Sequence, residues 1–264
     1  MKYRKSNKEV SMAASKDAPA SGGDIFSLIG QAFQMIEASW EALKLNIVTF
    51  ILVALAPFLA ILAAVITSSV IFTVSIINNA DSANSTISGF AWALSWLLSV
   101  IALVVALIFL PAITVTQLAS AKGKKISFGE AFEQGKKYIL RYIGIALLVG
   151  LIIGVPLILS FLLVFIIIGI LLVPLAIAWA IAFAFFMALA PYILIDKDKG
   201  VVDTMKLSYE ITKKNWKWVL AVYVVLWVIG LPSVIPYIGG IISAALSIAY
   251  FCLLPIVYVK HIKH

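Results

Sequence analysis

Long apolar intervals alternate along this 264-residue chain with short stretches that hold every positive charge. The twenty Lys and Arg residues lie within residues 2–44, 122–141, 197–217 and 260–263, and the intervals 45–121, 142–196 and 218–259 contain none. A helix needs roughly 20 residues to cross a bilayer core about 30 Å thick. Each interval is therefore long enough for two crossings, which return the chain to its starting side. Because Lys and Arg favour the cytoplasmic side, the pattern predicts an all-α polytopic membrane protein with six transmembrane helices and both termini in the cytoplasm.

The three apolar intervals are expected to fold as three membrane hairpins. The predicted spans cover about residues 46–77 and 90–118, 142–168 and 171–195, and 218–236 and 238–259. A polar run from Asn78 to Ser85 is the expected outer turn of the first hairpin. In the second hairpin Gly169 and Pro174 are expected to break the helix, because glycine and proline interrupt helical runs.

An amphipathic stretch precedes each hairpin. These stretches are predicted to form helices over residues 24–44, 127–140 and 200–216. In the first, Ile25, Ile29 and Phe33 recur at a helical step, and Ser127–Glu130 has the form of a capping box. Such helices lie in the membrane interface with the apolar face down, although they could instead simply extend the spans into the cytoplasm. Residues 1–23, rich in Ser, Ala, Lys and Gly, predict a disordered basic cytoplasmic tail.

The hairpins resemble one another in the placement of proline. The expected repeat units are residues 24–119, 120–196 and 197–264, with Pro57, Pro156 and Pro232 in the first spans and Pro111, Pro191 and Pro255 in the second spans. A proline inside a helix removes a backbone hydrogen bond and kinks the axis. The matched positions predict a threefold repeat of interface helix, kinked span and kinked return. Because all three units share one orientation, this differs from the inverted repeats of many secondary transporters.

The composition agrees with a membrane protein and limits the classes of partner that it is expected to contact. Hydrophobic residues make up 63% of the chain and charged residues 12%, and the net charge is +8. In a soluble protein this charge would suggest nucleic acid, but lysines beside apolar helices indicate contact with anionic lipid. We therefore expect lipid contact and no nucleic acid. The single cysteine, Cys252, lies in an apolar run and is expected to be a packing residue.

The apolar intervals lack the side chains that most membrane chemistry requires. Asp81, in the predicted outer turn, is the one Asp, Glu, Lys, Arg or His within residues 45–121, and residues 142–195 and 218–259 contain none. Ion-coupled carriers and pumps, by contrast, place such groups within their spans. No catalytic set, phosphate loop or metal cluster can be assembled, so we expect no enzyme activity, no cofactor and no metal site. Among the uncharged polar residues, Thr114, Gln117 and Ser160 are the candidates for a polar lining, the alternative being bonds between helices.

One stretch resembles a known family. Residues Ala190–Asp196, followed by Met205–Ser208 and Lys213–Trp216, resemble a broad family of prokaryotic six-span membrane proteins. That family includes the membrane domain attached to some bacterial glycerophosphodiester phosphodiesterases. Its members pair an Ala-Pro ending one span with a Lys/Arg-x-Ser helix leading into the next, and Lys206-Leu207-Ser208 matches this element. The resemblance covers residues 120–260 and implies a membrane module in the inner membrane of a prokaryote, without the catalytic domain.

These observations favour a non-enzymatic membrane protein that organises lipid or a partner protein at the cytoplasmic face. The expected headgroup contacts are the cations Lys122, Lys124, Lys125, Lys136, Lys137, Arg141, Lys206, Lys213, Lys214 and Lys217. The same cations would also be present if they served only to fix topology. Two alternatives remain: a transporter or permease subunit for an apolar or amphiphilic substrate, and an accessory subunit of a lipid-metabolising enzyme. A protein partner or a second copy of the chain is a further expected contact.

Overall fold

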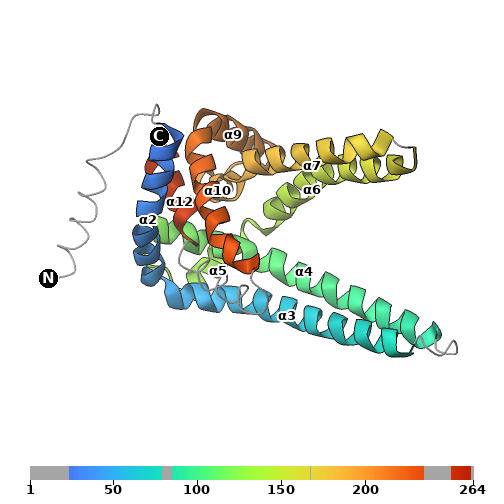
Figure 1. Cartoon of the computed structure of the whole chain (residues 1–264). Helices are drawn as coiled ribbons and strands as arrows, with labels where there is room; N and C mark the ends of the chain where they lie inside the picture. Colours follow the sequence, from blue (N-terminus) through green and yellow to red (C-terminus); the bar gives the residue numbers. More distant parts are fainter. Residues whose placement is uncertain (1–23, 79–84, 167, 235–250, 263–264) are drawn as a thin grey trace.

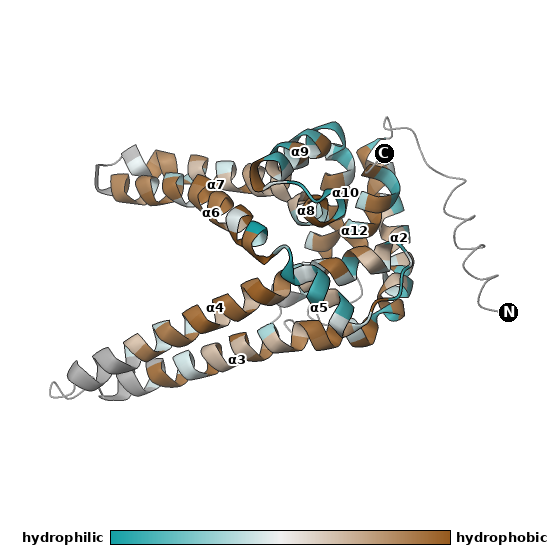
Figure 2. Ribbon diagram, turned by 180° about the vertical axis from the view of Figure 1, so that it is seen from behind, coloured by the Kyte–Doolittle hydropathy of each residue, from teal (hydrophilic) through white to brown (hydrophobic). Residues whose placement is uncertain are grey.

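Every regular element that the structure describes is a helix, which confirms the predicted all-α class. The computed structural model describes residues 24–78, 85–166, 168–234 and 251–262. Figure 1 shows two long hairpins that extend and diverge from a group of shorter helices. We call this group the head, and it comprises the helices within residues 25–45, 128–136, 190–230 and 253–262. Figure 2 shows that polar residues gather on the head and that the hairpins are apolar along their length. The predicted tail and most of the predicted outer turn lie outside the described residues.

The first hairpin is preceded by a helix that crosses its base. Helix α2 covers Ile25–Leu45, α3 covers Ile47–Asn78 and α4 covers Ser85–Ala121. A single residue, Asn46, separates α2 from α3, and its backbone (φ −127°, ψ 23°) departs from helical geometry. The chain turns sharply there, so α2 runs across the direction of α3 (Figure 1).

The second hairpin has the same order of elements but turns at a different place from the prediction. Helix α5 covers Phe128–Lys136, α6 covers Ile139–Leu162, η1 covers Leu163–Ile166 and α7 covers Ile168–Met187. The prediction that Pro174 breaks the helix is wrong, because Pro174 lies within α7. Gly169 does serve the turn: a Cβ there would come within 2.0 Å of the Val164 backbone nitrogen. Glycine lets the two helices approach this closely.

The return span of the second hairpin is interrupted near its end. After α7 the chain makes a turn at residues 188–189, and α8 covers Ala190–Lys197 with proline in its first turn. Because Pro191 has no N–H, the Met187 carbonyl cannot accept the usual helical bond. Helix α9 follows at Val201–Lys214. Between them Asp198 takes a left-handed conformation at φ 49°.

The third predicted pair of spans is only partly described. Helix α10 covers Trp216–Gly230 and η2 covers Leu231–Val234, and after a gap α12 covers Leu253–Val257 and the π-helical η3 covers Tyr258–Ile262. Most of the predicted span 238–259 lies outside the described residues. Helix α10 has 15 residues, about 22 Å at 1.5 Å per residue, and it packs beside α2 across the direction of the hairpins (Figure 1).

Four helices within the described ranges are long and apolar enough to cross a membrane. Their apolar segments are Ile47–Ile71, Trp92–Ala121, Ile139–Leu162 and Gly169–Lys197. Large apolar side chains face outward along them, such as Trp96 at 70% and Leu171 at 80% exposed. Exposed apolar surface of this extent is typical of helices in lipid. The chain is therefore a multi-pass membrane protein, whereas the six-span count stays a prediction.

The core of the protein lies in the head. Buried apolar residues of α2, α8, α10 and α12 form one cluster, which includes Ala32, Ile193, Val222 and Val257, each fully or almost fully buried. The end of α4 joins this cluster through Leu118. The hairpins are thus held together at their polar ends, and the packing there positions the residues described next.

Candidate functional site

Each amphipathic helix packs against the end of another helix at the head. Helix α5 lies so close to α4 that a Cβ on Gly135 would stand 2.6 Å from the Ala112 backbone nitrogen. Helix α9 contacts α7, where the Ser208 hydroxyl donates to the Phe186 carbonyl at 2.8 Å. Helix α2 contacts α12, where Leu43 belongs to a buried cluster with Cys252 and Ile256. These contacts leave the polar faces of α2, α5 and α9 on the outside of the head (Figure 2).

The ten predicted headgroup cations fall into three groups. Three of them pair with carboxylates: Lys122 with Asp196 at 2.6 Å, Lys136 with Glu133 at 3.4 Å and Arg141 with Asp198 at 2.5 Å. Six others are exposed and form no ion pair among the described residues, namely Lys124, Lys125, Lys137, Lys206, Lys213 and Lys214. Lys217 is half-buried and has an interaction partner. Most of the predicted cations are therefore open to an external anion.

A buried acid joins three parts of the chain at the centre of the head. The Asp196 side chain, at the end of α8, is only 3% exposed and accepts hydrogen bonds from Lys122 Nζ and from the Tyr258 hydroxyl at 3.2 Å. Lys122 directly follows α4 and Tyr258 begins η3. A buried carboxylate of this kind requires such partners to stay charged. The junction therefore fixes the ends of α4 and α8 in the head against the start of η3.

The three residues predicted as a polar lining each form a hydrogen bond to another group of the protein. Gln117 Nε2 donates to the Phe251 carbonyl at 3.0 Å, and the Thr114 hydroxyl lies 2.8 Å from that of Tyr142. Ser160 donates to the Pro156 carbonyl of its own helix at 2.7 Å. These hydrogen bonds join helices or stay within one helix, and the lining role stays a prediction.

The predicted kink prolines occupy three kinds of position. Pro57, Pro111 and Pro156 lie inside the continuous helices α3, α4 and α6, Pro232 lies in η2, Pro255 lies in α12 and Pro191 lies in the first turn of α8. Within the described ranges, only Pro191 coincides with a break in a long apolar helix. The Ser208 hydroxyl bonds the Phe186 carbonyl beside that break. The Lys-x-Ser element therefore contacts α7 four residues before the Ala-Pro element.

Asn46, counted from the sequence among the polar residues of the first span, instead holds the elbow between α2 and α3. Its side chain is 3% exposed and donates to the Ser120 hydroxyl at 3.0 Å and to the Lys124 carbonyl at 2.8 Å. Its oxygen accepts from the Ile126 backbone N–H at 2.8 Å, and the Thr49 hydroxyl donates to the Ile126 carbonyl at 2.7 Å. These bonds tie the loop after α4 to the elbow.

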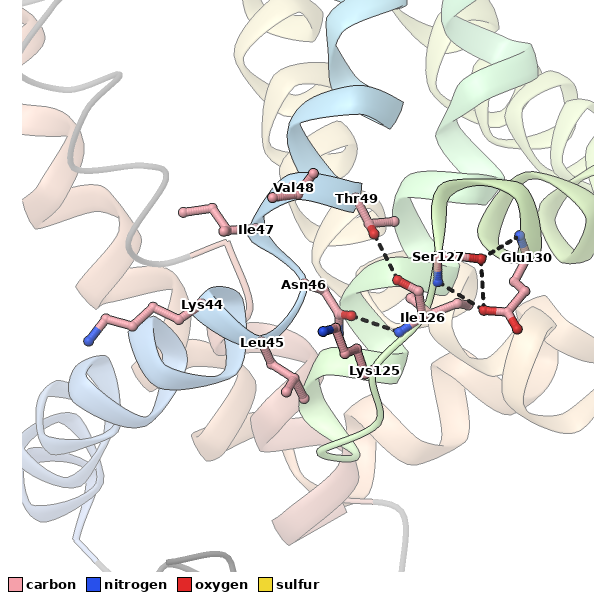
Figure 3. A pocket seen from close by; sticks show the side chains of 10 residues that line it. All are labelled: Lys44, Leu45, Asn46, Ile47, Val48, Thr49, Lys125, Ile126, Ser127 and Glu130. Carbon is pink, nitrogen blue, oxygen red and sulfur yellow. Dashed lines mark hydrogen bonds between the residues drawn. The ribbon is translucent and has the colours of Figure 1, made fainter. Parts of the chain in front are cut away.

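A hollow of about 640 Å³ opens beside this elbow. Its walls are the elbow and the start of α3 on one side and the loop before α5 on the other (Figure 3). The lining residues are Lys44, Leu45, Asn46, Ile47, Val48, Thr49, Lys125, Ile126, Ser127 and Glu130. The hollow is thus lined by two cations, one acid and several apolar side chains, and it lies where the head meets the first hairpin.

The predicted capping box at the start of α5 is confirmed and forms one edge of the hollow. Glu130 Oε2 accepts from the Ser127 N–H and from the Ser127 hydroxyl, both at 2.9 Å, and the hydroxyl accepts from the Glu130 N–H at 3.3 Å. The pKa of Glu130 is lowered below its ordinary value, mainly by the hydrogen bond from the Ser127 backbone N–H and also by the one from the Ser127 hydroxyl. The carboxylate is therefore ionised at neutral pH.

Sequence reasoning did not identify the Asp196 junction or the elbow hollow. One signal was present for the junction, because Asp196 is the first charge after an apolar interval of 54 residues without any acid or base. The hollow depends on contacts between residues about 80 positions apart, such as Ile126 with Asn46, and no local pattern carries that information.

Comparison of the chain with protein-family models, with curated proteins and with solved structures gives no match. The resemblance to the membrane domain of the phosphodiesterases therefore stays a prediction from the motifs around Pro191 and Ser208.

Proposed function

We propose that this protein binds anionic lipid headgroups at the cytoplasmic membrane surface through the basic helices of its head. The observation that carries the proposal is the set of exposed lysines without an ion-pair partner among the described residues, which comprises Lys124, Lys125, Lys137, Lys206, Lys213 and Lys214. Each cation near an anionic membrane surface contributes on the order of 1 kcal/mol.

The arrangement of the hairpins supports placing these lysines on one side of the membrane. Helices α3 and α4 form one hairpin and α6 and α7 another, and both are joined to the head at their polar ends (Figures 1 and 2). Because Lys and Arg favour the cytoplasmic side, we place the head, both termini and the third basic stretch in the cytoplasm. The inner membrane of a prokaryote is the proposed location.

The packing of the amphipathic helices supports the proposed threefold repeat. Helix α5 packs on α4 beside Pro111, α9 packs on α7 before Pro191, and α2 packs on α12 around Pro255. Each amphipathic helix thus contacts the end of a different return helix, and the three contacts close a ring. A ring of equivalent contacts is what three tandem copies of one unit produce.

The proposal is tested by the lipid selectivity of the reconstituted protein. Spin-labelled phosphatidylglycerol and phosphatidylcholine report how strongly each lipid associates with the protein surface. We expect selectivity for phosphatidylglycerol that weakens with added salt, because salt screens exposed charges. A variant with K124Q, K125Q, K137Q, K206Q and K214Q should lose most of this selectivity.

Two paired cations provide a matched control. Replacing Lys136 and Arg141 by glutamine removes charge at positions that already face Glu133 and Asp198. This variant should lose less selectivity for each charge removed than the variant in which five of the six unpaired lysines are replaced. Equal association of the two lipids with the unaltered protein would overturn the proposal. A topological role alone predicts that result.

The two alternatives from the sequence, a permease and an accessory subunit of a lipid enzyme, stay predictions. The candidate lining residues Thr114, Gln117 and Ser160 hydrogen-bond to protein atoms, so they offer no specific support for a permease. Lipid binding by the head is compatible with an accessory role, and co-purification in mild detergent would identify such a partner.

A further inference from the structure

We infer that the hollow at the elbow between α2 and α3 binds the headgroup of a phospholipid that carries both a phosphate and a primary ammonium, as phosphatidylethanolamine does. The inference rests on the proposed function, since it requires the elbow to lie at the headgroup level of the membrane. It adds a specific zwitterionic site to a surface that otherwise attracts anionic lipid through charge alone.

The uncharged polar groups of the hollow are already committed to protein bonds. The side-chain NH₂ group of Asn46 donates hydrogen bonds to the end of α4 and the loop after it, and its side-chain oxygen accepts one from that loop. Thr49 donates to the Ile126 carbonyl. Ser127 donates to Glu130 and accepts from its backbone N–H. Figure 3 shows this chain of bonds running along the wall. Recognition of a ligand therefore falls to the charged side chains.

The charged side chains comprise two cations and one anion, which match the charges of a zwitterionic headgroup. Lys125 is exposed and forms no ion pair among the described residues. Lys44 pairs with Glu41 at 2.6 Å, but both side chains are about half exposed, and such pairs contribute little and exchange readily. Glu130 keeps one carboxylate oxygen outside its bonds to Ser127. A phosphate suits the lysines, and an ammonium suits the carboxylate.

The apolar part of the hollow continues onto the lipid-facing side of α3. Val48, which lines the hollow, is 67% exposed, and Ile51 and Leu52 in the next turn are 53% and 47% exposed. An acyl chain can therefore follow α3 while its headgroup occupies the hollow. The volume of about 640 Å³ falls within the range of small-ligand sites.

The test is a titration of the purified full chain in mild detergent, followed by native mass spectrometry. Phosphatidylethanolamine, phosphatidylcholine and phosphatidylglycerol with identical acyl chains serve as probes. Phosphatidylcholine has no N–H to donate, and phosphatidylglycerol has no amine. We expect phosphatidylethanolamine to bind more tightly than phosphatidylcholine, and E130Q to weaken its binding about tenfold without weakening the binding of phosphatidylglycerol.

The variant E130Q is informative because glutamine can also complete a capping box, so α5 keeps its start while the charge is lost. K125Q should weaken the binding of all three lipids, since each has a phosphate, whereas K199Q should leave binding of phosphatidylethanolamine unchanged, because Lys199 is exposed and lies outside both the hollow and the proposed headgroup-binding lysines. Unaltered binding of phosphatidylethanolamine to E130Q would overturn this inference. If phosphatidylglycerol selectivity over the head survives in that case, the proposed function stands. If that selectivity is also absent, both fail.

Discussion

The junction at Asp196 makes a quantitative prediction about stability. Its side chain is 3% exposed and its partner Lys122 is 29% exposed. Breaking a buried ion pair by removing one partner costs about 3–5 kcal/mol, because an uncompensated charge stays buried. Lys122 keeps some access to water, which lowers that cost, and asparagine can still accept from Tyr258. We therefore expect D196N to reduce the free energy of unfolding by about 2–3 kcal/mol.

The pair of Arg141 with Asp198 provides the matched control. Both side chains are well exposed, at 43% and 68%, and exposed pairs contribute less than about 1 kcal/mol. Asparagine also tolerates the left-handed backbone at Asp198. D198N should therefore lower the free energy of unfolding by less than about 1 kcal/mol.

The assay is equilibrium unfolding in mixed micelles of dodecyl maltoside and increasing dodecyl sulfate, followed by far-ultraviolet circular dichroism. Both variants remove one negative charge near the C-terminal end of α8, so a general electrostatic effect would shift the two equally. Equal free energies of unfolding for D196N and D198N would refute the reasoning that burial makes the first pair important.

Three further predictions concern the helices of the head. G135A should destabilise the protein by about 1–3 kcal/mol, because the new Cβ meets the backbone of α4. G129A has open space around the new Cβ and should be neutral or stabilising by up to about 1 kcal/mol. Thermal unfolding in detergent compares the two variants. The lowered pKa of Glu130 means that its contribution to the start of α5 is present above the unfolded pKa of about 4.3 and is lost as pH falls through the lower folded value. The protection of α5 amides from hydrogen exchange, taken relative to the intrinsic rate at each pH, should therefore fall in acid. The same fall in E130Q would contradict this. N46A should cost about 3 kcal/mol, since it removes three bonds and leaves a buried N–H without its acceptor, and N215A, whose amide bonds only its own helix, should cost clearly less.

The sequence predicted the features that depend on local composition. The cation-free intervals identified the two described hairpins, since a charge is costly in lipid whatever its neighbours. The Ser127 capping box was also predictable, because its bonds span only three residues. The break before Pro191 follows from the missing N–H of proline.

The features that depend on contacts between distant segments were not predictable. Asp196, Lys122 and Tyr258 are separated by more than sixty positions along the chain, and nothing local marks them as partners. The turn of the second hairpin was misjudged because Pro174 lies early in α7, where neighbouring helices in a membrane can accommodate proline. The role of Asn46 was missed because a polar residue beside an apolar run has the same pattern at an elbow as inside a span.

The sidedness of the head is the claim on which the proposed lipid contacts depend, and cysteine labelling in intact cells measures it most directly. Single cysteines replace Lys137 in the head and Asp81 in the predicted outer turn, and the buried Cys252 should stay unlabelled as an internal control. We predict that a membrane-impermeant maleimide labels position 81 in intact cells and labels position 137 only after the membrane is permeabilised. Labelling of both positions from the same side would contradict the account.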